Sequence, residues 1–343
     1  GVTTVYGGHA MGFEQIEVYR WLCQEERLSV RVLCAPEVEP YGTPWSPEPL
    51  DVAEYRQRLD RARDLVDRSD PWFRVDGATI GRGGPCWPGL LLMREPYRGP
   101  YGEATTGRSF VSPEKVELAI RYCHEHGVRL SIVTAGVAEH DDYLDMLEAL
   151  DQAPLHADGR AWIAQHLYFV EPAQARRLAA LGFDVTTSLS FLWGKGEMVR
   201  ERLGEEYLLD FIPVARLLAA GLRVAAGSDW GPKNAFEQIA LAVSPHFGAS
   251  GRASPLPGIT REAALAMWTR EAAHVLRWDG IGSIEPGHLA DLIVVDRDPL
   301  TTPVEELPST RVLTTIVGGK TLDGDRWISP GGDRPGRTPR RRR

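Results

Sequence analysis

The chain has 343 residues, of which 43% are hydrophobic and 25% charged, as in an ordinary globular protein of one large domain or two smaller ones. Its formal net charge of −8 gives no reason to expect nucleic acid or an anionic membrane as a partner. The sequence shows no membrane-span or signal-peptide pattern, and its four cysteines are scattered like reduced thiols, so we expect a cytoplasmic protein.

The first part of the chain alternates predicted strands with predicted helices. Strand patterns cover Gly1–Tyr6, Leu28–Cys34 and Trp72–Asp76, and helical patterns cover Phe13–Glu26 and Asp51–Arg68. Because the sequence opens directly on a strand and without an initiator Met, we expect it to start inside a longer fold.

A long segment rich in glycine and proline, Gly77–Phe110, interrupts this alternation. Loops of that length in a compact domain usually form a lid or a binding loop. Ser112 and Pro113 then predict a helix start, with serine as N-cap and proline in the first turn, and Gly127 predicts its end.

The alternation continues through the second half. Strands are predicted at Val128–Thr134, Arg160–His166, Phe183–Ser188 and Leu222–Ala226, and helices at His140–Leu150, Glu171–Leu181, Tyr207–Ala220, Asn234–Val243 and Thr260–Leu276. Seven strands in this order predict a parallel α/β fold. An eight-stranded barrel cannot close on seven strands, so two alternatives stay open: a doubly wound open sheet, or a barrel with one further strand upstream.

Asp229 follows the last of these strands, after the turn Gly227-Ser228. The carboxyl ends of parallel strands are where ligands bind in α/β proteins. A carboxylate there serves as a metal ligand, as a general base or as the N-cap of the next helix; the local sequence by itself favours the N-cap, and the rest of the chain shifts the balance toward the other roles.

The C-terminal part has a different pattern. Gly282–Asp296 and Thr310–Leu322 predict short strands of a small β appendage. The final segment, Gly331–Arg343, holds six arginines and one aspartate without large apolar residues, which predicts a disordered basic tail.

Several of these segments resemble one known family. The block Gly282–Asp296 is similar to the closing signature of the metal-dependent amidohydrolase superfamily, and Ile259–Leu276 is similar to the helix that precedes it. Asp76-Gly77 and the loop that follows, as far as Pro96-Tyr97, resemble amidohydrolase family 3, which includes N-substituted formamide deformylase-like enzymes.

The resemblance implies a TIM-type (β/α)8 barrel that lacks its first strand in this chain, so that the seven predicted strands are barrel strands two to eight. It divides the chain into a barrel domain at 1–280, the C-terminal part of a composite β-sandwich at 281–328 and the tail at 329–343. The missing first strand is the one that carries a His-x-His metal pair in the family.

The resemblance also implies a metal site that this sequence fills only in part. It makes His166 a metal ligand and Asp229 both a ligand and the proton shuttle. The family's strand-five histidine falls at Val133 or Thr134, and its strand-four lysine falls near Trp72, where no lysine occurs. A zinc site of this type needs about four ligands, so His166 and Asp229 do not complete one.

Three further residues are candidates for the pocket. His9 leaves the first predicted strand among glycines and is either a substitute ligand or substrate contact, or a solvated rim residue. Asp76 is a candidate from its place at a strand end. Trp230 either walls the pocket or is a packed aromatic residue. We expect His166 and Asp229 to point into one pocket at the carboxyl face.

The function implied is metal-dependent hydrolysis of a non-peptide carbon–nitrogen bond in a small amide, formamide or cyclic imide. The cofactor would be a divalent metal, zinc by preference, and the partner a small-molecule substrate, with a homo-oligomer left open. The alternative is a non-catalytic barrel or a truncated enzyme with an incomplete metal site. Hydrolysis of other bonds on the same scaffold also stays open, because a fold does not fix chemistry.

Overall fold

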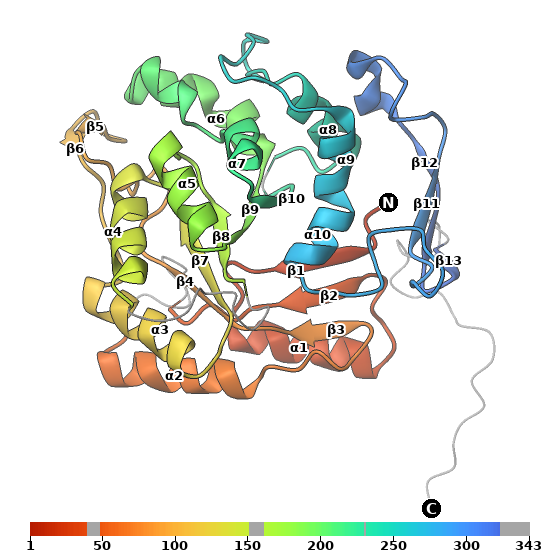
Figure 1. Cartoon of the computed structure of the whole chain (residues 1–343), viewed down its shortest axis with the longest axis horizontal. Helices are drawn as coiled ribbons and strands as arrows, with labels where there is room; N and C mark the ends of the chain where they lie inside the picture. The colour runs from red at the N-terminus through yellow and green to blue at the C-terminus, as the bar shows by residue number, and fades with distance from the viewer. Residues whose placement is uncertain (40–48, 151–160, 230, 323–343) are drawn as a thin grey trace, which may run out of the picture.

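The structure is a computed structural model that describes residues 1–39, 49–150, 161–229 and 231–322, and it shows parallel strands flanked by helices (Figure 1). The helices are α1 (Phe13–Gln24), α2 (Val52–Asp64), α3 (Pro113–Glu125), α4 (Val137–Glu148), α5 (Pro172–Ala180), α6 (Leu189–Arg202), η1 (Glu206–Leu209), α7 (Val214–Ala219), α8 (Ala235–Val243), α9 (Arg261–Trp268), α10 (Arg270–Val275) and η2 (Val304–Ser309). The strands are β1 (Thr4–Gly7), β2 (Arg31–Cys34), β3 (Phe73–Val75), β4 (Ala78–Gly81), β5 (Tyr97–Arg98), β6 (Ala104–Thr105), β7 (Leu130–Thr134), β8 (Ile163–His166), β9 (Asp184–Thr187), β10 (Arg223–Ala226), β11 (Leu292–Val295), β12 (Val312–Val317) and β13 (Lys320–Leu322). The predicted α/β class is confirmed, whereas the predicted basic tail lies outside the described residues.

The parallel strands form two arrays, in the orders β1-β2-β3 and β10-β9-β8-β7-β4. Backbone hydrogen bonds join the arrays beyond the end of β2, where Thr79 N donates to Pro36 O at 2.8 Å and Val38 N donates to Thr79 O at 3.0 Å. The strands therefore follow one another in sequence order across a continuous parallel sheet. Within the described residues β1 pairs only with β2, and β10 only with β9, so these two strands form the ends of the sheet.

Strands β3 and β4 are two halves of one strand, broken at Gly77. Gly77 has φ +89°, and a Cβ there would lie 2.1 Å from the carbonyl oxygen of Arg129, so only glycine fits. The first half pairs with β2 and the second with β7. The predicted loop Gly77–Phe110 therefore begins with a strand, and it also holds the small hairpin β5–β6.

The helices largely follow the predicted pattern. Ser112 Oγ accepts a hydrogen bond from Lys115 N with Pro113 at the helix start, and Gly127 takes φ +62° just after the helix, as predicted. Two differences are instructive. Helix α6 was not predicted, and the single helix predicted at Thr260–Leu276 is divided into α9 and α10 at Thr269, whose backbone is not helical.

The sheet curls strongly, so that one of its faces encloses polar side chains. Tyr6 on β1 contacts Ser131 on β7 across the intervening strands, with 3.0 Å between the hydroxyl oxygens. Gln165 on β8 donates from Nε2 to Ser131 Oγ at 2.5 Å and to Gly8 O at 2.7 Å. The opposite face carries apolar residues such as Ile132 that belong to the main hydrophobic core with the surrounding helices.

The C-terminal strands form a separate antiparallel sheet, in the order β11-β12-β13, which lies beside the N-terminus (Figure 1). A buried ion pair attaches it to the parallel sheet: Arg31 Nε and Nη2 donate to Asp291 at 2.7 and 2.9 Å. The Arg31 guanidinium also stacks over the Trp72 ring, and Gly318 N donates to Asp291 Oδ1. This bidentate pair fixes the appendage by geometry as well as charge.

Among the helices that the structure describes, none has the length and apolar character needed to cross a membrane.

Candidate active site

His166 and Asp229 meet at the carboxyl ends of the parallel strands, as predicted. His166 ends β8 and Asp229 follows β10, and His166 Nε2 lies 3.3 Å from Asp229 Oδ2. Both residues have a left-handed backbone, with φ +69° and +44°. Such conformations cost energy in residues other than glycine and concentrate at functional sites. The strand ends therefore hold these two side chains together in a conformation that folding alone does not favour.

His9 joins this pair from the loop after β1. Its ring contacts the His166 ring edge to face, with 5.5 Å between the centroids. His9 Nδ1 lies 3.3 Å from Glu37 Oε2, and the same oxygen accepts a hydrogen bond from Ala10 N at 2.6 Å. The site thus contains two histidine–carboxylate pairs, His166 with Asp229 and His9 with Glu37.

Exposure differs among the four side chains. His9 is 41% exposed, Asp229 31% and His166 15%, whereas Glu37 is only 1% exposed. Solvent and a small molecule can therefore reach His9 and Asp229 directly. Glu37 is buried and contacts the inner side of the site, through His9 and Ala10.

The two histidines have opposite electrostatic environments. Burial lowers the pKa of His166 below its usual value, and the hydrogen bond to Asp229 offsets this only in part. Burial acts on His9 in the same direction, but the hydrogen bond and charge of Glu37 outweigh it and raise the pKa of His9. Neighbouring groups whose pKa values are pushed apart can serve as a proton donor and a proton acceptor.

Aromatic residues surround His166 on its other sides. Tyr168 stacks on the His166 ring at 5.4 Å, and Phe191 contacts it edge to face at the same centroid distance. Trp87, from the long loop after β4, extends this cluster by stacking on Phe191 and packing against Tyr168. The predicted role of the loop in shaping the site therefore has a physical basis in Trp87.

The arrangement fits two positions of a metal site. Ligands about 2.1 Å from a tetrahedral zinc lie about 3.4 Å apart, and the His166–Asp229 separation of 3.3 Å matches that spacing. Within the described ranges, however, no group of three or more His, Cys, Asp or Glu side chains is placed to hold a metal ion. Thr134 stands beside His166 in the register of β7 and β8, and its buried hydroxyl has no hydrogen-bond partner among the described residues. His166 and Asp229 therefore fit a metal without completing its site.

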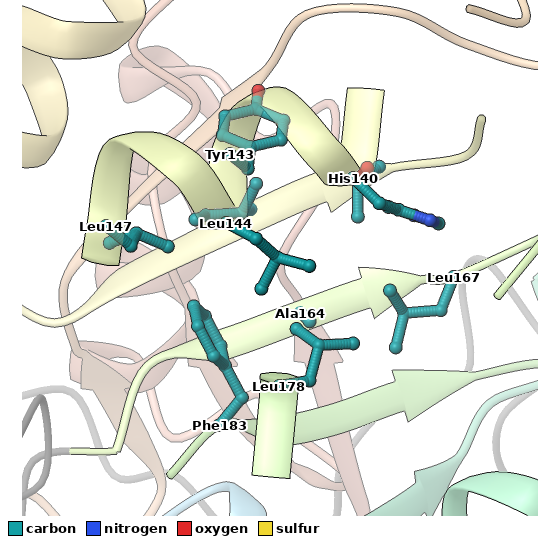
Figure 2. Close-up of a pocket in the computed structure, with 10 residues that line it drawn as sticks. His140, Tyr143, Leu144, Leu147, Ala164, Leu167, Leu178 and Phe183 are labelled. Carbon is teal, nitrogen blue, oxygen red and sulfur yellow. The ribbon is translucent and has the colours of Figure 1, made fainter. Parts of the chain in front are cut away.

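Of the other predicted pocket residues, the structure describes Asp76 and places it away from this site. Asp76 precedes β4 at the amino end of the sheet, where its Oδ2 is 3.7 Å from Arg129 Nη1, so the structure does not bring it together with His166. Trp230 lies outside the described residues. His140 is buried in the first turn of α4 and lines a mainly apolar cavity of about 20 Å³ between that helix and the sheet (Figure 2). That volume admits one water molecule at most, so the cavity is not the active site.

Two residues that matter to the site were not predicted from the sequence. Glu37 follows β2 and Gln165 precedes His166 on β8, and both hold the loop that carries His9. A signal for Glu37 existed, because a carboxylate three residues after a predicted parallel strand lies at the same edge as Asp229. Gln165 gave no such signal, since its role depends on a contact with a residue 157 positions away.

Comparisons with known proteins identify the family of this chain and proteins of similar fold. A sequence model described as amidohydrolase family matches residues 1–323. An N-substituted formamide deformylase from Arthrobacter pascens is 34% identical over 218 residues, which is 62% of this chain and 40% of that protein. The fold resembles an uncharacterized metal-dependent hydrolase from Pyrococcus horikoshii, with TM-score 0.70, 19% identity, and coverage of 88% of this chain and 57% of that one. It also resembles an atrazine chlorohydrolase from Arthrobacter aurescens complexed with zinc, with TM-score 0.57, 18% identity, and coverage of 94% and 68%. The match thus spans about two fifths of the length of this formamide deformylase.

Proposed function

This chain belongs to the amidohydrolase family, and on that premise we propose that it hydrolyses a carbon–nitrogen bond of a small amide, formamide or cyclic imide. The observation that supports this proposal is the contact of His166 with Asp229 at 3.3 Å, on a left-handed backbone and beside the exposed His9. The proposed scaffold is the TIM-type barrel, with the parallel strands as its strands two to eight and the C-terminal strands as part of a β-sandwich.

Under this proposal, His166 and Asp229 would hold a divalent metal, zinc by preference, together with further donors. A metal at such a site lowers the pKa of bound water into the neutral range. Asp229, which is 31% exposed, would accept a proton from the attacking water and then donate it to the leaving nitrogen. In the alternative role, His166, held by Asp229 and by the Tyr168 and Phe191 rings, would polarise the substrate carbonyl instead of binding the metal.

The first experiment is elemental analysis of the purified protein and of Asp229→Asn, combined with hydrolysis assays on formamides, linear amides and cyclic imides. We expect bound metal and amide hydrolysis in the wild type, and loss of most metal together with about 10²–10⁴-fold lower activity in the variant. A His246→Gln variant, changed on a partly exposed side chain after α8, is the matched control and should behave as wild type.

A second candidate is a non-catalytic barrel. The observation that favours it is that no third metal donor joins His166 and Asp229 among the described residues. The residue paired with His166 on the neighbouring strand β7 is Thr134, not a histidine. Metal-free protein that hydrolyses none of the three substrate classes would support this reading and overturn the hydrolase proposal.

A further inference from the structure

The loop after β1 is fixed by residues from two other strands, β4 and β8, and from the segment that follows β2. The carbonyl oxygen of Gly8 accepts hydrogen bonds from Thr79 Oγ1 on β4 at 2.8 Å and from Gln165 Nε2 on β8 at 2.7 Å. Glu37 holds the next two residues, because its Oε2 contacts both His9 Nδ1 and Ala10 N. Consecutive residues 8, 9 and 10 are thus each tied to the sheet.

The backbone of this loop is strained, and the burial of the carboxylate that supports it costs free energy. Ala10 has φ +53°, a left-handed conformation that alanine adopts only when its surroundings impose it. Glu37 is almost fully buried, and its second oxygen, Oε1, has no hydrogen-bond partner within the part of the chain that the structure describes. A buried carboxylate with one unpaired oxygen is expensive. A merely solvated rim histidine would not need such a support.

The contact with Glu37 also determines which nitrogen of His9 is available. A carboxylate accepts hydrogen bonds, so Nδ1 must carry the hydrogen that faces Glu37. In the neutral ring Nε2 then has a free lone pair. The ring is 41% exposed and lies beside His166, so a small molecule at the site can approach it.

We propose that His9 is a substrate-binding residue whose Nε2 accepts a hydrogen bond from an N–H group of the substrate, and that Glu37 is the positioning residue that fixes its ring. The substrate class is therefore an amide or imide that bears a hydrogen on nitrogen, in preference to a fully substituted amide. This inference rests on the proposed function, because it assigns His9 to the same site.

The test compares two small amides that differ in the N–H group, N-methylacetamide and N,N-dimethylacetamide. In protein labelled with ¹⁵N at histidine, and at a pH where the ring is neutral, we expect the His9 signals to show hydrogen on Nδ1. Addition of N-methylacetamide should shift the Nε2 signal, and N,N-dimethylacetamide should not. His9→Gln assigns the signals by removing them, and His246→Gln is the control that should leave them unchanged.

Two variants test the support of the ring. Glu37→Gln can donate as well as accept, so we expect a mixture of ring tautomers and a smaller response to N-methylacetamide. Thr79→Val keeps Glu37 and removes one of the two donors to Gly8 O, so it tests the loop even where Glu37→Gln fails to fold. In hydrolysis assays with N-methylformamide and N,N-dimethylformamide, His9→Gln should raise KM about tenfold for the N–H substrate only, with kcat nearly unchanged.

The outcomes separate the two proposals. A hydrogen on Nε2 in the neutral ring, or equal shifts with both acetamides, would overturn the assignment of His9 even if the protein hydrolyses formamides. Absence of hydrolysis in the wild type would instead overturn the proposed function, while the labelled ring still shows whether His9 recognises an N–H group.

Discussion

At the amino ends of the parallel strands Arg129 lies between two carboxylates, whereas at the carboxyl ends His9 and His166 each contact one. Arg129 is 3% exposed and donates to Asp184 Oδ2 at 3.2 Å, to Val275 O at 2.6 Å and to Ala161 O at 2.8 Å. Its guanidinium therefore has partners on several sides and no opening toward a ligand.

The difference shows how similar charged groups serve different purposes at the two ends. The network around Arg129 links the amino ends of β7 and β9 to the end of α10. The carboxyl end instead keeps its charged groups partly exposed and places Ala10, His166 and Asp229 on a left-handed backbone. We therefore propose that the first cluster stabilises the fold and that the second serves function.

The largest effect is expected from Arg129→Met. Removal of the guanidinium leaves Asp184 and Asp76 as buried charges without their main partner, which typically costs about 3–5 kcal/mol. Urea unfolding of the variant measures this loss. Arg223→Met is the matched control, because its pair with Glu271 is exposed and should contribute under about 1 kcal/mol. Equal losses in the two variants would contradict a structural role for the Arg129 network.

Acid sensitivity should arise outside both charged clusters, at His140. Burial lowers the pKa of His140 from its ordinary value of 6.5 to about 4, so the folded protein keeps this ring neutral. Between those pH values the unfolded chain binds the proton and the folded chain does not, so stability is complete above about pH 6.5 and falls as the pH drops toward 4. The loss is on the order of 3 kcal/mol.

His140→Leu tests this prediction, because leucine suits the apolar cavity beside α4 (Figure 2). The free energy of unfolding, measured from pH 4 to 8, should depend less steeply on pH in the variant than in the wild type. Parallel pH curves would show that another group controls acid unfolding.

The alternation of strands and helices along the chain could be predicted from the sequence, because buried parallel strands carry apolar, β-branched runs that stand out between helices. The order of the strands in the sheet was implied only by the family resemblance. The break of one strand into β3 and β4 could not be predicted, since Gly77 is required only by the approach of Arg129 O, far along the chain. Helix α6 was missed because Gly194 and Gly196 interrupt its pattern. At Gly196 the structure gives the reason: a Cβ there would lie 2.2 Å from the Phe247 ring.

In the candidate site, too, residues marked by local sequence could be predicted, and residues that act through long-range contacts could not. His166 and Asp229 could be predicted because each stands at a strand end, where local sequence and chain topology agree. Asp76 also follows a strand, but that strand continues as β4, so its carboxylate lies at the amino end of the sheet. The contribution of Glu37 and Gln165 depends on contacts across the sheet that no single segment of sequence encodes.

Asp229→Asn should change stability least of the three variants, although it should lower activity most. Asparagine adopts the left-handed backbone at φ +44° at least as readily as aspartate, and its side-chain oxygen can still accept from His166 Nε2. Asp229 is also partly exposed, so loss of its charge costs less than loss of a deeply buried charge. We expect the free energy of unfolding to change by less than about 1 kcal/mol, in the range of ordinary surface substitutions. Urea unfolding of metal-free protein provides the measurement, and a loss as large as that of Arg129→Met would mean that the carboxyl end, too, is built chiefly for stability.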